Sequence, residues 1–283
     1  MSTLRLRGRV FGPGDHAIMA VVNRTPDSFY DRGATYGFTA ALDAASRLIS
    51  EGADIVDIGG VKAGPGDDVD VAEEIRRVAD LVAAVRERHD DVIISVDTWR
   101  AEVGEVVAAA GADLLNDTWG GVDPGLADVA AKHDIGLVCA HAGRVEPRTR
   151  PHRIAYDDVV GDVVSYTTDL AAKALAAGVS RDRILIDPAH DFGKNTYHSL
   201  ELSRRLDEMV ATGWPVLVAV SNKDFVGETL GGLPVDQRHA GTLATLAISA
   251  VQGARVFRVH DAASARKVLD VVSRIPPASA VDH

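Results

Sequence analysis

The chain has 283 residues and carries 30 basic against 41 acidic side chains, so its formal net charge at neutral pH is −11. No run of Lys or Arg offsets this acidic balance, which argues against a protein that binds duplex nucleic acid. The single cysteine, Cys139, excludes a disulfide framework, and no apolar run approaches the roughly 20 residues that span a bilayer. We predict a globular protein of the cytoplasm without membrane association.

Short apolar runs alternate with longer amphipathic segments along the chain. Eight of the short runs are rich in Val and Ile and do not alternate with polar residues, which is typical of parallel strands covered on both faces. These predicted strands cover residues 17–22, 54–58, 92–96, 113–115, 136–140, 183–186, 216–220 and 255–257.

The segments between the predicted strands show helical spacing. In three of them, apolar residues recur at steps that place them on one helix face. The sets are Ala41, Ala45 and Leu48; Val71, Ile75, Val78, Val82 and Val85; and Leu243, Leu246, Ala247, Ala250 and Val251. Gly52 and Gly111 stand where a helix should end before the next strand.

Eight strands, each leading into a helix, predict an α/β fold, a single (β/α)8 TIM barrel. A doubly wound open sheet is the alternative, because strand order is not visible in a sequence. We place the barrel at residues 17–275, after an N-terminal extension at 1–16 and before a flexible C-terminal tail at 276–283.

Polar or ionisable residues follow all eight predicted strands. A single strand-end Asp more often caps a helix or turns the chain. The repetition favours a functional site instead, because barrel enzymes work at the carboxyl ends of their strands. In chain order these residues are Asn23, Asp57, Asp97, Asn116 with Asp117, His141, Asp187, Ser221 with Lys223, and Arg258 with His260.

Motifs of several other chemistries are absent from the sequence. It has no Gly-rich phosphate loop, no paired cysteines, no His-Glu-x-x-His zinc motif and no Gly-x-Ser-x-Gly nucleophile turn. The strand-end residues are therefore suited to binding a polar heterocycle and an anion rather than to forming a covalent intermediate.

A series of short motifs runs from about residue 17 to residue 270. Residues 21–29 read VVNRTPDSF and residues 52–60 read GADIVDIGG. Further motifs are SVDT at 95–98, ND at 116–117, DP at 187–188 with FGK at 192–194, VS at 220–221 with Lys223, and RVHD at 258–261. In content and order, the series resembles the dihydropteroate synthase family over nearly the whole chain.

The resemblance implies a (β/α)8 barrel and a condensation without a protein nucleophile. In that reaction a dihydropterin carrying a methyl diphosphate loses diphosphate, and the amine of para-aminobenzoate takes the carbon. The catalytic residues would be Asp97 and Lys223. The substrate-binding residues would be Asn116, Asp187, Phe192, Ser221, Arg258 and His260. The resemblance also implies Mg²⁺ near Asn23, and a homodimer formed through the helices of the last repeats.

Two loops depart from the family pattern. The second loop usually reads GGESTRPG but reads GGVKAGPG at 59–66, so Ala63 and Gly64 replace a threonine and an arginine. Lys62 restores a charge but not the bidentate fork of arginine. After the seventh strand, SRKS becomes SNKD, and Asp224 replaces a serine that helps to bind aminobenzoate. If Asp224 faces that site, two carboxylates about 4 Å apart repel by roughly 1–4 kcal/mol; otherwise it turns outward and caps the next helix.

The residues expected around the pterin pocket also differ. The family's DPGxGF becomes DPAHDF at 187–192, so Ala189 and Asp191 replace glycines. Ala140 and Ala142 flank His141 where the family usually has bulky apolar residues, which predicts a wider pocket floor. The polar pterin set is retained, whereas the parts that serve diphosphate, aminobenzoate and pocket packing are altered.

We interpret the chain as a dihydropteroate synthase-like protein with weak or no synthase activity. One alternative is a working synthase in which Lys62 and a rearranged second loop replace the missing groups. Another is a non-catalytic protein that binds a pterin or another anion. A methyltransferase of the related pterin-binding barrels is disfavoured, because those lack the complete first motif.

The fifth loop, at 143–155, carries the densest basic cluster of the chain. We predict a solvated loop, with a site for an anionic ligand or partner as the alternative. The cluster is Arg144, Arg148, Arg150, His152 and Arg153.

Overall fold

The computed structural model describes residues 3–26, 33–149 and 155–275 of the chain. Three predictions fall wholly or partly outside the described residues: positions 27–29 of the first motif, positions 150, 152 and 153 of the basic cluster, and the tail at 276–283. The predicted division into extension, barrel and tail therefore stays a prediction.

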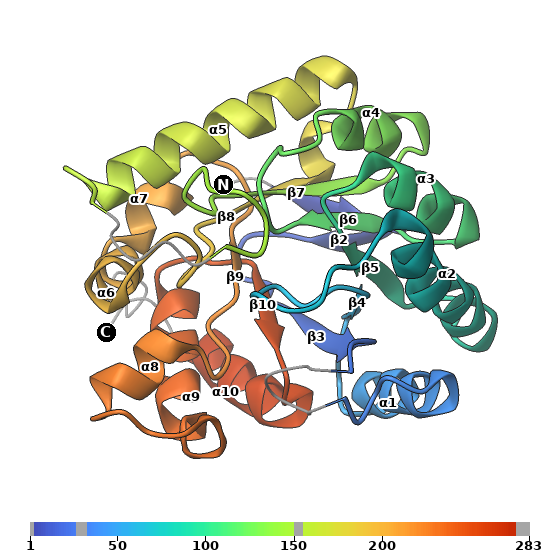
Figure 1. Ribbon diagram of the computed structural model, residues 1–283. Coiled ribbons are helices and arrows are strands. Elements are labelled where there is room, and N and C mark those ends of the chain that lie inside the picture. Colours follow the sequence, from blue (N-terminus) through green and yellow to red (C-terminus); the bar gives the residue numbers. More distant parts are fainter. Residues whose placement is uncertain (1–2, 27–32, 150–154, 276–283) are drawn as a thin grey trace.

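Within the described residues, eight parallel strands form one sheet that curves into a barrel, with helices around its outside (Figure 1). The strands are β3 (Ala17–Asn23), β4 (Ile55–Gly59), β5 (Ile93–Asp97), β6 (Leu114–Asp117), β7 (Gly136–Ala140), β8 (Ile184–Asp187), β9 (Leu217–Val218) and β10 (Val256–Val259). The predicted strands match these positions closely, except that β9 is shorter than the predicted 216–220.

The order of the strands decides between the two predicted folds. It runs β8-β7-β6-β5-β4-β3-β10-β9, so each strand lies beside its neighbour in sequence. The two ends of the sheet meet where Ile186 bridges to Val216 in parallel, and where the Ile186 amide donates to the Pro215 carbonyl at 2.9 Å. This closure excludes the open doubly wound sheet and confirms the (β/α)8 TIM barrel.

Helices connect the barrel strands and cover the sheet from outside. They are α1 (Phe38–Ser50), α2 (Val71–Arg88), α3 (Ala101–Ala110), α4 (Gly125–Lys132), α5 (Val159–Ala177), α6 (Thr196–Arg204), α7 (Leu206–Val210), α8 (Asp224–Thr229), α9 (His239–Val251) and α10 (Ala262–Arg274). Local sequence sets their ends. Asp70 and Asp158 accept hydrogen bonds from the first-turn amides of α2 and α5, and Gly111 ends α3 with a left-handed φ of +113°.

The predicted apolar helix faces are buried in α1 and α2, but the prediction for α9 is partly wrong. Val251 is 74% exposed, whereas Thr242 and Ser249 are buried. The sequence of α9 has small or apolar residues on every side, so its periodicity does not single out one face. None of the described helices is long and apolar enough to cross a membrane.

A hairpin that the sequence analysis did not predict closes the amino-terminal end of the barrel. Strands β1 (Leu4–Leu6) and β2 (Arg9–Phe11) pair in antiparallel fashion. Leu4, Leu6 and Phe11 are buried in one cluster with side chains from the beginnings of the barrel strands, such as Met19 and Leu114. The hairpin fills this end of the barrel. A ligand cavity is therefore expected at the opposite end, where the strands have their carboxyl ends.

Candidate functional site

A cavity of about 520 Å³ opens at the carboxyl ends of the barrel strands. Five of the predicted site residues line it: Phe192, Ser221, Lys223, Arg258 and His260. Asp97 and Asp187 end the strands β5 and β8, and Asn116 is the last but one residue of β6; none of the three lines the cavity, and they make the contacts described below. The structure therefore brings most of the predicted residues to one end of the barrel.

Arg258 is the centre of a buried ionic cluster. Its Nε donates to Asp57 Oδ2 at 2.6 Å, and one Nη donates to Asp97 Oδ2 at 2.9 Å. Asp57 also accepts from Ser95 Oγ at 2.6 Å and from Asn116 Nδ2 at 3.3 Å. One guanidinium is thus shared between two carboxylates, and burial raises the pKa of Asp97 to about 7 although Arg258 opposes this shift. Asp57 was noted only as a strand end, and this contact gives it a role as the partner of Arg258.

Lys223 lines the cavity, and Asp187 at the end of β8 interacts with it electrostatically. Lys223 Nζ donates to the His190 carbonyl at 2.5 Å and stands 4.7 Å from the centre of the Phe192 ring. Burial lowers the pKa of Lys223 to about 8. Asp187 Oδ1 accepts from the Ala189 amide at 2.7 Å, and burial raises its pKa. These groups offer a hydrogen-bond donor, an acceptor and an aromatic face to one ligand.

His260, Ser221 and Asn23 complete the predicted set. Ser221 Oγ and His260 Nδ1 are 2.9 Å apart, so the two residues form one polar group at the ends of their strands. Asn23 ends β3 opposite Gly59 of β4, and its side-chain oxygen lies where a Cβ on Gly59 would come within 3.2 Å. Because residue 59 is glycine, no Cβ occupies the space beside the Asn23 side-chain oxygen.

Asp191 and Asp224 both line the cavity, but each carboxylate has a partner within the protein. Asp224 Oδ1 is 2.8 Å from Arg238 Nη1, and its side chain is 56% exposed. Asp191 accepts from Ser199 Oγ at 3.1 Å and from the Phe225 amide at 3.2 Å. Glu228, which sequence analysis missed, also lines the cavity and accepts a hydrogen bond from Thr196. Three carboxylates therefore share one wall.

The second and fifth loops meet beside the cavity. Lys62, Ala63 and Gly64 line it, and Arg148 Nε donates to the Gly64 carbonyl at 3.3 Å. The basic cluster of the fifth loop is visible in the sequence, but the residues that its arginines contact are not.

The predicted wide floor around His141 is not part of the cavity lining. His141 is fully buried, and Lys194 and Asp162 bind its two ring nitrogens. The aromatic lining comes instead from Phe192 and Trp119, which pack edge to face with ring centres 5.3 Å apart. Trp119 is a cavity residue that sequence analysis did not mention, and Lys194 appeared there only as the last residue of the FGK motif.

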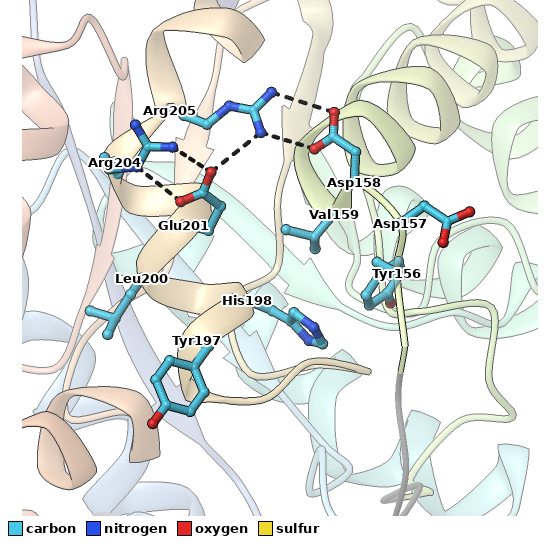
Figure 2. A pocket seen from close by; sticks show the side chains of 10 residues that line it. All are labelled: Tyr156, Asp157, Asp158, Val159, Tyr197, His198, Leu200, Glu201, Arg204 and Arg205. Carbon is cyan, nitrogen blue, oxygen red and sulfur yellow. Dashed lines mark hydrogen bonds and ion pairs between the residues drawn. The ribbon is translucent and has the colours of Figure 1, made fainter.

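A second hollow, of about 500 Å³, lies between the beginning of α5 and helix α6 (Figure 2). Arg205 joins its two sides by pairing with Asp158 and Glu201. Arg204 also pairs with Glu201, and the Tyr156 and His198 rings meet edge to face at 5.0 Å. None of the predicted site residues lines this hollow, whereas five of them line the first cavity, so the first cavity is the candidate functional site.

A closed barrel with convergent polar groups at the carboxyl ends of its strands defines a class of proteins that hold a small polar ligand at this face. The chain belongs to the pterin-binding enzyme family, whose model, described as "Pterin binding enzyme", matches residues 19–260.

Similar proteins agree with this assignment. The chain is 57% identical over 267 residues to "Inactive dihydropteroate synthase 2" of Mycobacterium tuberculosis, covering 93% of this chain and 84% of that relative. It is 54% identical over 274 residues to the protein of the same name from Mycobacterium leprae, covering 95% and 94%. A crystal structure of Yersinia pestis dihydropteroate synthase with a sulfonamide drug complex superposes with a TM-score of 0.89 at 36% identity, covering 95% and 97%.

Proposed function

We propose that this chain is a dihydropteroate synthase-like protein that binds a pterin-class ligand but does not carry out the condensation with para-aminobenzoate. The observation that carries the proposal is the wall formed by Asp191, Asp224 and Glu228. An aminobenzoate is itself a carboxylate, and each unpaired like charge about 4 Å away costs roughly 1 kcal/mol in water and more where water is excluded. The ion pair with Arg238 reduces the contribution of Asp224. The two mycobacterial relatives named as inactive support the same conclusion.

The pterin end of the proposed site rests on Asp97, Asp187, Asn116 and Lys223. Carboxylates accept hydrogen bonds from the amino and ring N–H groups of a pterin, and an ammonium donates to its carbonyl. Phe192 offers the flat heterocycle an aromatic surface. Asp97 would stabilise the cation that develops at the methylene carbon, and Lys223 would donate to the pterin carbonyl, which are the roles that the resemblance implies for them.

The anion end of the proposed site rests on Arg258, His260 and Ser221. Arg258 is already paired with Asp57 and Asp97, so an incoming phosphate must share its guanidinium with them. Ser221 and His260 add donors beside it. A diphosphate therefore finds fewer uncommitted positive groups here than in a site that also has an arginine on the second loop.

Mg²⁺ enters the proposal together with a diphosphate. The described residues hold no group of three or more His, Cys, Asp or Glu side chains that could bind a metal. Mg²⁺ usually keeps several waters and takes one or two protein oxygens plus phosphate oxygens. The Asn23 amide oxygen fits such an ion, which would neutralise phosphate charge when it is bound.

A working synthase is the second candidate function, and one observation favours it. Gly64 stands where the family has an arginine, but Arg148 of the fifth loop places a guanidinium beside the Gly64 carbonyl. Together with Lys62, it could serve the same phosphate. A turnover measurement separates the two functions.

We also propose that the protein forms a homodimer and is located in the cytoplasm, as the sequence analysis predicts. Apolar side chains on the outer surface of the last repeats support a dimer, because monomers rarely expose such groups together. They are Ile248 and Val251 of α9 with Val271 and Ile275 at the end of α10, each between 53% and 74% exposed. Light scattering would measure the mass, and a monomer at micromolar concentration would contradict the dimer.

Calorimetry with dihydropterin diphosphate, Mg²⁺ and aminobenzoate tests the proposed function. We expect binding of the pterin at pH 7, where Asp97 is partly ionised and Lys223 is largely protonated, and no detectable binding of aminobenzoate. Because the Asp97 carboxylate must be ionised to accept pterin N–H groups and its pKa is about 7, pterin affinity should fall about tenfold for each pH unit below 7.

Two variants test whether the pH dependence comes from Asp97. Asp97→Asn should bind weakly and lose the pH dependence. Asp117→Asn is the matched control, because burial also raises the pKa of Asp117 to about 7, yet Asp117 is not implied to bind the pterin: its Oδ2 accepts from the Gly121 amide at 2.6 Å, whereas Asp97 pairs with the cavity residue Arg258. The absence of pterin binding at pH 7, or tight aminobenzoate binding, would overturn the proposal.

A further inference from the structure

The loop between β8 and α6 has a backbone conformation that its own residues do not favour. Ala189, Asp191 and Gly193 have left-handed φ angles of +47°, +69° and +58°. A left-handed backbone is unfavourable for residues that carry a side chain, as Ala189 and Asp191 do. Side-chain contacts must therefore hold the loop in place against its local backbone preference.

Lys194 supplies several of these contacts. It is only 6% exposed, and its Nζ lies 2.9 Å from the Phe192 carbonyl and 3.2 Å from the Ala189 carbonyl. The His141 carbonyl, just beyond the end of β7, is 2.6 Å from the same atom. Three carbonyl acceptors require three N–H donors, which only the ammonium form of lysine has. One buried charge thus joins two carbonyls of the loop to a neighbouring strand.

His141 completes the surroundings of this ammonium. Its Nε2 is 2.8 Å from Asp162 Oδ2, and its Nδ1 is 3.0 Å from Lys194 Nζ. Burial and the nearby Lys194 lower the pKa of His141 to about 4, so the ring is neutral. A proton on Nε2 that points to Asp162 leaves Nδ1 as a fourth acceptor near Lys194, so one of the three ammonium N–H groups is shared between two acceptors. The chain Asp162–His141–Lys194 therefore runs from the beginning of α5 into the cavity wall.

The loop held in this way carries groups of the candidate site. The Phe192 ring stands between Trp119 and Lys223. The His190 carbonyl accepts from Lys223, which fixes the position of that second ammonium. The backbone is also close-packed, since a Cβ on Gly193 would lie 2.5 Å from the Ala142 carbonyl oxygen. If the loop relaxes, both Phe192 and Lys223 lose their positions.

The geometry points to Lys194 as a positioning residue for the ligand cavity: its ammonium, shared among the His141, Ala189 and Phe192 carbonyls, holds the β8–α6 loop in the conformation that places Phe192 and Lys223. The consequence for ligand affinity rests on the proposed function, whereas the consequence for the loop itself does not.

Hydrogen–deuterium exchange of the whole protein tests this inference in Lys194→Gln and Lys194→Met variants. Gln and Met are similar in size, but Gln keeps two N–H donors and Met keeps none. The measurement is made at pH 6, below the pKa of about 7 to which burial lowers Lys194. Lys173→Met, at an exposed position of α5, is the matched control.

We expect exchange in peptides covering 187–195 to be slowest in the parent protein, faster in Lys194→Gln, and faster still, by about tenfold or more, in Lys194→Met. Exchange in the barrel strands and in Lys173→Met should not change. Equal exchange in Gln and Met would mean that only packing matters and would overturn the inference, as would unchanged exchange in both. If Lys194→Met does not fold, Lys194→Gln against the parent protein decides.

Calorimetry with 6-hydroxymethylpterin gives a second readout for the same variants. Affinity should fall in the order parent, Gln, Met. If the parent protein binds no pterin, the proposed function fails, while the exchange series still decides whether Lys194 positions the loop. If all three bind equally although the loop exchanges faster, the positioning role for the cavity is wrong.

Discussion

Replacement of Arg258 by methionine is expected to destabilise the protein by about 3–5 kcal/mol, because it leaves the two buried carboxylates of Asp57 and Asp97 without their shared cation. Arg258 lies 2.6 Å and 2.9 Å from these groups, and Asp57 has no exposed side-chain surface. For a chain of this size the loss corresponds to a fall in Tm of roughly 6–20 °C, measured by thermal or chemical unfolding.

Arg255 provides a matched control for this prediction. It stands three positions earlier, is also buried, and its Nε and Nη1 have no hydrogen-bond partner. Arg255→Met should therefore be close to neutral, or should stabilise the fold. Adding Asp57→Asn and Asp97→Asn to Arg258→Met should restore part of the lost stability, because the uncompensated charges are removed. Equal effects of Arg255→Met and Arg258→Met would contradict the ionic cluster as we describe it.

Replacement of Leu6 by alanine is expected to destabilise the protein by about 2–5 kcal/mol, which is the usual range for a buried leucine. Leu6 is 1% exposed and packs with Leu4, Phe11 and Leu114 where the hairpin closes the barrel. Val10→Ala is the control, because Val10 belongs to the same hairpin but is 50% exposed and should change stability by less than about 0.5 kcal/mol.

Urea unfolding of Leu6→Ala and Val10→Ala tests whether the hairpin contributes to the core of the barrel. If Leu6→Ala costs no more than Val10→Ala, the hairpin does not contribute to the core of the barrel. In that case β1 and β2 would be a loosely attached N-terminal extension, and the barrel would be stable without them.

The barrel strands could be predicted because parallel strands buried on both faces leave continuous runs of Val and Ile in the sequence. The hairpin could not. Its strands have three residues each, and Leu4, Leu6 and Phe11 are too few to form a periodic pattern. Their burial depends on the open end of a barrel built from residues far along the chain.

The candidate site was predictable as a list of residues but not as a set of contacts. The residues Asp97, Lys223 and Arg258 stand at strand ends, which sequence patterns reveal. That Arg258 reaches Asp57 and Asp97 follows from the order of strands β3, β4, β5 and β10 around the barrel, which no sequence pattern shows.

The orientations of individual carboxylates could likewise not be predicted from the sequence. Asp224 had two open alternatives in the sequence, toward the aminobenzoate site or outward. The structure places it at the cavity edge in an ion pair with Arg238, which lies 14 positions later. Glu228 joins the same wall only because α8 follows Lys223 directly. Such contacts depend on side-chain rotamers and on long-range packing, which local sequence does not determine.

The formation of pteroate from dihydropterin diphosphate, para-aminobenzoate and Mg²⁺ by the purified protein tests the central claim most directly. The account predicts that the pterin binds but that no pteroate forms above the rate without protein. Turnover near an ordinary enzyme rate of about 10 per second would contradict the account, and would mean that Lys62 and Arg148 replace the missing arginine of the second loop.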